Sequence, residues 1–197
     1  MKHLLAITAA TAAALSFGTL AMADDDATPE TKCPTNIAIG IDAKFGPGAA
    51  TLTECLAYRT ELKIVASWTN KETNAKSGIG QQVVNIKNVV TDYEKYGLVV
   101  GTDPAIVVVG YGAGARWLLS DAAYVAKVDP NAVNGVNPSR VTVEYLLGKN
   151  VRVLMCQNTM TANGYTVADL LPGVQMTPAG VTAVIEYQQR EYSYIAP

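Results

Sequence analysis

The sequence predicts an α/β fold in a single domain, with a mostly parallel sheet and helices on both of its faces. Two observations predict this fold. From about residue 62 to the C-terminus, short β-branched apolar runs alternate with longer segments whose apolar residues recur at helical spacing, which is typical of parallel strands joined by crossover helices. In addition, the run Ala105–Val109 is apolar at every position, as expected for a strand that is buried on both faces.

The first strand and helix are expected between residues 62 and 97. The run 62–68, LKIVASW, is rich in β-branched residues and predicts a strand. The segment 78–97 predicts a helix that ends at Gly97. Its apolar positions recur at helical spacing: Val83, Ile86, Val90 and Tyr93.

The second strand, Ala105–Val109, is followed by the glycine-rich turn GYGAGA at 110–115 and by a helix predicted to begin within 116–120. This order superficially matches a dinucleotide-binding fingerprint, but no acidic residue closes a second strand about 20 residues further on. We therefore interpret the glycines as a tight strand-to-helix turn, with nucleotide binding as the weaker alternative. Since ligands collect at the carboxyl ends of parallel strands, Tyr111 and Gly112 are candidate binding residues.

The remaining elements continue the alternation. Ser139 is a possible N-cap and Gly148 a stop for a helix within 137–150. This helix leads into the strand Val151–Met155 and then to Cys156. A short helix and a turn at 162–164 follow, and three further elements are predicted: a strand at 174–178, a helix at 179–191 and a last strand at 192–196.

The N-terminus has the pattern of a cleavable secretory signal over residues 1–23. A short positive segment precedes a nearly uncharged apolar run, and Ala21 and Ala23 provide the small residues that a signal peptidase requires. A membrane anchor is the alternative, but the many Ala and Thr residues of the run and the cleavage site argue against it. We expect export to a bacterial periplasm, an N-terminal extension at 24–62 and the α/β domain at 63–197.

Composition excludes several classes of function. The only histidine, His3, leaves with the signal, so the exported chain has no imidazole for general-base, Ser-His-Asp, Cys-His or His-zinc chemistry. Three cysteines without a CxxC spacing cannot form a four-thiolate site. We therefore predict no metal and no cofactor. The formal net charge of -2 also gives no footprint for nucleic acid, and no second apolar run is long enough for membrane insertion.

The three cysteines divide into two groups. Cys33 and Cys55 lie in the N-terminal extension, and an oxidising compartment favours a disulfide between them. Cys156 is then left as a free thiol at the carboxyl end of a strand, where the helix that follows and its backbone amides favour the thiolate. The alternatives are that Cys156 pairs with one of the other two, that none of the three pairs, and that Cys156 is a packed structural thiol.

Several of these stretches together resemble the DsrE/DsrF-like sulfur-relay family, and most closely its exported single-domain members. They are VVVGYGAGARWLL, GKNVRVLMCQNTM, LLPGVQMTPAGV and the final EYQQREYSYIAP. The resemblance implies a five-stranded fold of the YchN type, assembly into trimers or hexamers, and a strand-end cysteine that carries sulfur as a persulfide. Cys156 matches that cysteine, and Gly164 is similar to the glycine that closes the loop behind it.

This chain departs from the resemblance in the loop after the cysteine, where the sulfur-relaying relatives have basic residues and this chain has MTAN at 160–163. Two function classes follow. The first is a periplasmic sulfur carrier or thiol-reactive protein that uses Cys156, with Asn158 and Thr159 as donors to the thiolate and with the sulfur donor and acceptor left open. The polar turn 157–159 is expected to expose the thiol. The second is a non-catalytic oligomeric binding or interaction module of the same fold.

Overall fold

The structure is a computed structural model, and it describes residues 38–39, 54–55, 63–95 and 106–197. Its main feature is a five-stranded sheet in the order β6-β5-β4-β3-β7, in which all neighbouring strands are parallel. The strands are β3 (Ile64–Trp68), β4 (Ile106–Gly110), β5 (Arg152–Cys156), β6 (Gln175–Thr177) and β7 (Ser193–Ile195). The predicted α/β fold is confirmed, and the sheet is parallel throughout.

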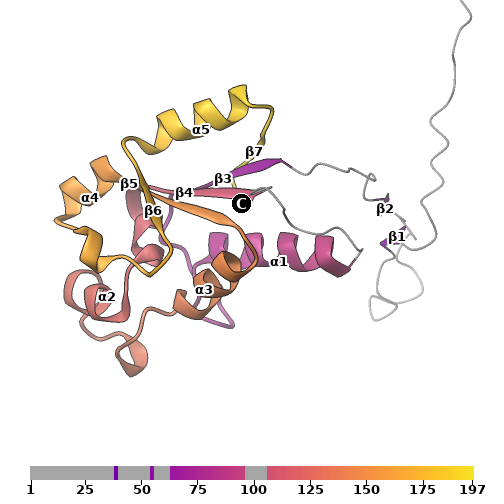
Figure 1. Ribbon diagram of the computed structural model, residues 1–197. Coiled ribbons are helices and arrows are strands. Elements are labelled where there is room, and N and C mark those ends of the chain that lie inside the picture. Colours follow the sequence, from indigo (N-terminus) through magenta and orange to yellow (C-terminus); the bar gives the residue numbers. More distant parts are fainter. Residues whose placement is uncertain (1–37, 40–53, 56–62, 96–105) are drawn as a thin grey trace, which may run out of the picture.

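Helices cover both faces of this sheet, as predicted. They are α1 (Gln81–Lys95), α2 (Asp121–Lys127), α3 (Arg140–Gly148), α4 (Gln157–Asn163) and α5 (Gly180–Gln189). In Figure 1, α5 lies on one side of the sheet and α1 and α3 lie on the other. We call these the α5 face and the α1 face.

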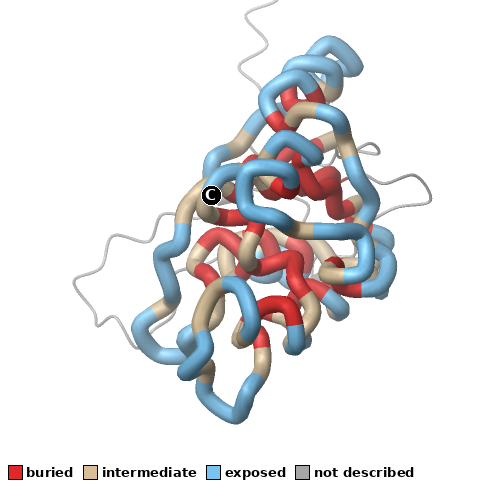
Figure 2. Tube along the Cα trace, turned by 90° about the vertical axis from the view of Figure 1, so that its left-hand side faces the viewer, coloured by how far each residue is buried: buried red, intermediate tan, exposed pale blue. Residues whose placement is uncertain are grey.

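Alternation along the central strands sends side chains into two separate cores. On β5, Val153 and Met155 belong to the cluster on the α1 face, whereas Leu154 belongs to the smaller cluster on the α5 face. All five residues of β4 are buried, which confirms the expectation of a strand covered on both sides. Figure 2 shows that buried segments lie in the interior of the domain and that exposed segments surround them.

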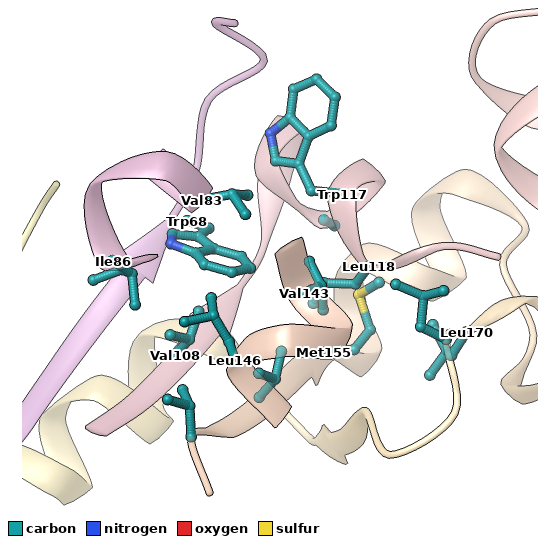
Figure 3. Close-up of a cluster of buried hydrophobic side chains, with 14 of the residues drawn as sticks. Trp68, Val83, Ile86, Val108, Trp117, Leu118, Val143, Leu146, Met155 and Leu170 are labelled. Carbon is teal, nitrogen blue, oxygen red and sulfur yellow. The ribbon is translucent and has the colours of Figure 1, made fainter. Parts of the chain in front are cut away.

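The larger core lies between the sheet and helices α1 and α3. The predicted apolar face of α1 is confirmed, because Val83, Ile86 and Val90 are all fully buried there. Two tryptophans, Trp68 from the end of β3 and Trp117, are also buried in this cluster (Figure 3). Removing a large apolar side chain from water contributes about 1.5 to 3 kcal/mol, so this cluster is the main source of the stability of the sheet.

The helix predicted to begin within 116–120 begins later. Residues Gly112–Leu118 form a 3₁₀ helix, and α2 begins at Asp121, where the Ser120 hydroxyl accepts the Ala123 N–H at 3.3 Å. The reason is a long-range contact. The side-chain amide of the buried Asn137 donates hydrogen bonds to the carbonyl oxygens of Trp117 and Leu119 at 3.1 and 2.7 Å. Those carbonyls therefore have partners outside an α-helix.

Ser139 precedes α3 as expected, but its hydroxyl does not cap that helix. It accepts the N–H of Gly80 at 3.0 Å instead. Ser139 is fully buried, so this bond fixes the loop before α1 to the start of α3. Ser139 is therefore the N-cap residue of α3, as predicted, but a more distant backbone donor takes the place of the capping bond.

The N-terminal predictions mostly fall outside the described residues. The strands β1 (Ala38–Ile39) and β2 (Glu54–Cys55) pair in an antiparallel two-stranded sheet. Cys33 and the signal at 1–23 lie outside the described part of the chain, so the disulfide with Cys55 and the cleavage stay predictions. Among the helices that the structure describes, none is both long enough and apolar enough to span a bilayer.

Candidate functional site

Cys156 is the last residue of β5 and lies at the carboxyl edge of the parallel sheet. The neighbouring strand β4 ends at the same edge with Gly110, which pairs with Met155, and β3 ends there with Trp68, which pairs with Gly110. This is the edge where loops and helix N-termini meet in parallel α/β folds. The strand therefore fixes the thiol where the glycine-rich turn after β4 can reach it.

The Cys156 side chain points to the α5 face, and the first helical residue of α5 binds it. Since Leu154 packs on the α5 face and Met155 on the α1 face, alternation directs Cys156 back to the α5 face. There the backbone N–H of Gly180 donates to Cys156 Sγ at 3.2 Å. The sulfur thus lies at the N-terminus of α5, which carries partial positive charge.

Helix α4, which begins directly after Cys156, supplies the other donors to the sulfur. As hydrogen-bond donors, the backbone N–H groups of Asn158 and Thr159 and the Thr159 hydroxyl lower the pKa of the Cys156 thiol. Together with the Gly180 N–H they form what we call the donor cluster. Asn158 and Thr159 were candidate donors from the sequence, and the structure brings both to the thiol.

Thr159 is itself held in place by the glycine-rich turn. Its Oγ1 accepts the backbone N–H of Gly112 at 3.1 Å. Because a hydroxyl has a single proton, Oγ1 can accept from Gly112 and donate its proton to Cys156. Gly112 thereby joins the site as an anchor for Thr159. Its φ of +55° is one that glycine adopts without strain.

Two opposing effects act on the Cys156 thiol. Burial raises its pKa, because the charged form loses water. Hydrogen bonds from the donor cluster lower it, with the backbone N–H and hydroxyl of Thr159 ahead of the Gly180 and Asn158 amides. The hydrogen bonds outweigh burial, so the pKa lies below its ordinary value. The site favours the thiolate, the nucleophilic form of cysteine.

The prediction that the polar turn exposes the thiol is wrong. Gln157 and Asn158 are exposed, but Cys156 has only 4% of its surface exposed in this chain. The reason is the backbone of α5, because the Gly180 amide lies directly against the sulfur. A reagent must therefore pass the first turn of α5 to reach Cys156.

Tyr111 contacts the site through Gly180. A Cβ added at Gly180 would lie only 2.7 Å from the Tyr111 ring, so the ring packs directly on the glycine that holds the sulfur. Tyr111 also packs against the small core of the α5 face. Tyr111, one of the candidate binding residues, therefore acts on Cys156 indirectly, through its contact with Gly180.

Close packing accounts for two other glycines of the turn after β4. A Cβ on Gly114 would lie 2.4 Å from the carbonyl carbon and oxygen of Trp68. A Cβ on Gly110 would lie 2.6 Å from the Leu118 side chain. These contacts support the interpretation of a tight strand-to-helix turn rather than a dinucleotide fingerprint.

Two basic side chains of the elements around the site, Arg152 and Lys127, bind partners other than Cys156. Arg152 donates to the Tyr187 hydroxyl at 3.1 Å, on the α5 face. Lys127 of α2 binds the Gly164 carbonyl oxygen at 2.8 Å and an Asp169 carboxylate oxygen at 2.6 Å. Gly164 ends α4 with a φ of +66°. Lys127 therefore fixes the loop behind α4.

Sequence reasoning missed Gly180 and Lys127. Gly180 lies 24 residues from Cys156 and Lys127 lies 37 residues from Gly164 along the chain. The Gly180 contact is made by a backbone amide, which every residue except proline carries. No residue type or spacing in the sequence signals it.

Most of the chain matches one protein family. The model of the DsrE/DsrF-like family matches residues 69–197. The chain belongs to the DsrE/DsrF-like family. The matched span includes Cys156 and the whole donor cluster, and the resemblance inferred from the sequence is confirmed. Family membership indicates a role of the sulfur-relay type.

Two solved structures are similar to this member of the DsrE/DsrF-like family. One is the protein of unknown function MTH1491 from Methanobacterium thermoautotrophicum, with 26% identity, 70% of this chain and 100% of that chain covered, and a TM-score of 0.49. The other is the ychN protein from E. coli, with 12% identity, coverage of 68% and 97%, and a TM-score of 0.47. No curated protein matches the chain.

Proposed function

We propose that this DsrE/DsrF-like protein carries sulfur on Cys156, accepting a sulfane sulfur as a persulfide and passing it to an acceptor thiol. The observation that carries the proposal is the backbone N–H of Gly180, which donates to the sulfur of a strand-end cysteine at 3.2 Å. The Asn158 and Thr159 donors of α4 also favour the thiolate, because they lower the pKa of Cys156. Neutral donors of this kind stabilise a sulfur anion at a fixed position. The predicted signal at 1–23 supports placing this chemistry in the periplasm.

The proposed transfer requires no external oxidant. The Cys156 thiolate attacks the outer sulfur of a donor R–S–SH, a new S–S bond forms, and R–S⁻ leaves with the electron pair of the broken S–S bond. Cys156 then holds –S–SH. In the second half-reaction an acceptor thiolate attacks that outer sulfur, and the Cys156 thiolate leaves. The donor cluster would stabilise Cys156 as nucleophile in the first half and as leaving group in the second.

A second candidate function is an oligomeric binding module in which Cys156 is structural. The 4% exposure of Cys156 favours it, because free cysteine is among the most buried residue types. The two candidates differ in one observable property. A carrier thiol reacts in the folded protein, whereas a packed thiol reacts only after unfolding.

Replacing Thr159 by valine, which has nearly the same side-chain shape, should slow the reaction of Cys156. Valine has no hydroxyl, so the thiolate loses one donor and the pKa of Cys156 rises. A hydrogen bond to a charged group contributes about 1.5 kcal/mol or more, so alkylation by iodoacetamide at pH 7 should slow by up to about tenfold, less any gain in the nucleophilicity of the more basic thiolate. The measurement is the pH dependence of the alkylation rate.

Thr159→Ser is the matched control, because it keeps the hydroxyl that accepts from Gly112. It should retain most of the wild-type rate. Equal rates for Thr159→Val and the wild type across the pH range would show that the hydroxyl does not support the thiolate.

We also propose that the protein is a homo-oligomer, a trimer or a hexamer. Besides the family resemblance, apolar side chains on the α5 face support this: Val181 is 59% exposed, Ile185 49% and Tyr194 43%. Val181 and Ile185 are four residues apart and share one flank of α5. Light scattering of the purified protein should give a single species of three or six chains. A monomer at micromolar concentration would contradict this.

A further inference from the structure

The donor cluster also defines which sulfur compounds the site can accept. Its four donors are the N–H groups of Asn158, Thr159 and Gly180 and the Thr159 hydroxyl. All four are electrically neutral. Such donors stabilise one negative charge on the sulfur, but they do not supply the cationic side chains with which proteins bind multiply charged oxyanions.

Three basic side chains belong to the elements around the site, and each binds a partner other than the thiol. Arg116 donates from Nε to the Ala113 carbonyl oxygen at 2.9 Å. Arg152 is on the same strand as Cys156, but its guanidinium binds the Tyr187 hydroxyl at 3.1 Å. Lys127 lies beside the loop after α4, and its ammonium group forms a salt bridge of 2.6 Å with Asp169. In the described part of the chain, none of these three side chains donates a hydrogen bond to Cys156.

Access to Cys156 is limited by size as well as by charge. The thiol is 4% exposed, and the Gly180 amide lies at 3.2 Å from its sulfur. The Tyr111 ring packs on Gly180 so closely that a Cβ there would be 2.7 Å from the ring. Tyr111 therefore keeps the first turn of α5 over the thiol.

We propose that the Cys156 site selects small sulfane-sulfur donors with at most one negative charge, and that Tyr111 is the residue that sets the size limit. The inference rests on the proposed sulfur-carrier function. Hydrogen disulfide and its monoanion belong to this class of donor. Thiosulfate carries two charges, and a tripeptide persulfide is bulky, so both are excluded from the folded site.

Sulfur transfer from hydrogen disulfide to Cys156 needs no other reactant. The Cys156 thiolate attacks one sulfur of HS–SH, the S–S bond breaks, and HS⁻ leaves with its electron pair. The product is Cys156–S–SH. Oxidation states are exchanged between the two sulfur compounds, and no further reductant or oxidant takes part. Tyr111 touches none of the reacting atoms and acts as a positioning residue.

The first test uses two thiol reagents that differ in size and charge. Iodoacetamide is small and neutral, whereas the aromatic disulfide DTNB is large and carries two negative charges. For native protein we expect the ratio of DTNB rate to iodoacetamide rate to be at least about tenfold below that ratio for free glutathione, because DTNB needs a local opening of α5. An equal ratio would overturn the inference.

Variants of Tyr111 test its role. Tyr111→Ala should raise the DTNB rate by about tenfold or more relative to the iodoacetamide rate. Tyr111→Phe keeps the ring and should therefore have the same ratio of the two rates as the wild type. Tyr187→Ala is the matched control, because Tyr187 packs in the same cluster but binds Arg152 and contacts Tyr192 at 5.0 Å between ring centroids. An equal rise in Tyr187→Ala would show a general loosening of α5 and overturn the role of Tyr111.

Sulfur loading then separates the two proposals. Native protein is treated with hydrogen disulfide, with thiosulfate and with glutathione persulfide, and intact mass is followed beside Cys156→Ser. Loading by hydrogen disulfide alone supports the inference. Loading by thiosulfate or glutathione persulfide at a comparable rate overturns the selectivity and leaves the carrier function standing. Failure of all three to load Cys156 overturns the carrier function, whatever the two thiol reagents show.

Discussion

Gly114→Ala is expected to destabilise the domain by about 3 kcal/mol or more, at the upper end for overpacked cores. The added Cβ would lie 2.4 Å from the carbonyl carbon and oxygen of Trp68 and 2.6 Å from the Thr69 nitrogen. These neighbours are backbone atoms at the end of β3, so no side chain can rotate away to make room. Urea unfolding should show a lower midpoint with an unchanged slope.

Gly148→Ala is the control for the Gly114 experiment. Gly148 ends α3 and has no atom within 4 Å of an added Cβ. Since alanine favours helix over glycine by about 1 kcal/mol at most, this variant should be as stable as the wild type or slightly more stable. If Gly114→Ala also unfolded at the wild-type urea concentration, the close approach between the turn and β3 would be wrong.

Asn137→Ala is expected to cost about 3 kcal/mol, because it leaves several buried polar groups without partners. Asn137 is 2% exposed. Its amide donates to the Trp117 and Leu119 carbonyl oxygens at 3.1 and 2.7 Å, and its Oδ1 accepts the Ser139 N–H at 2.9 Å. Alanine can satisfy none of these groups.

The control for Asn137 is Asn131→Ala in the same loop. Asn131 is exposed, and surface substitutions of this kind change stability by about 0.5 kcal/mol or less. Thermal unfolding of both variants should separate them clearly. Similar melting temperatures for the two would mean that the buried Asn137 bonds contribute little to folding.

Gly114 and Asn137 also matter for the site. Asn137 holds the end of the 3₁₀ helix Gly112–Leu118, and Gly114 lies inside that helix. The same helix begins with Gly112, whose N–H positions the Thr159 hydroxyl at 3.1 Å. A substitution that loosens the helix should therefore also slow the reaction of Cys156.

The sequence could predict the sheet because its strands are apolar runs with a simple signature. The run that becomes β4 is apolar over Ile106–Val109, and every residue of β4 is buried on one face or the other. The helical spacing of Val83, Ile86 and Val90 predicted the buried face of α1 for the same reason. Burial of apolar residues leaves a period in the sequence that matches the element.

The site could be predicted only in part. The end of a parallel strand followed by a polar turn identified Cys156 and its local donors, because those residues are adjacent in the chain. The burial of the thiol was missed because it depends on Gly180, a backbone contact from 24 residues away. The 3₁₀ helix was missed for a similar reason. The carbonyl groups at its end accept hydrogen bonds from Asn137, which lies 18 to 21 residues further along the chain.

The proposed carrier role rests on whether Cys156 takes up sulfur in the folded protein. The measurement is the intact mass of the full chain, expressed with its N-terminal segment, recovered from a periplasmic extract and treated without reduction with hydrogen disulfide. The same mass reports cleavage after Ala23. We expect a gain of one or more sulfur atoms that reductant removes and that Cys156→Ser lacks. A Cys156 that gains no sulfur in the folded protein, yet is fully alkylated after denaturation, would contradict the carrier role and favour a packed structural thiol.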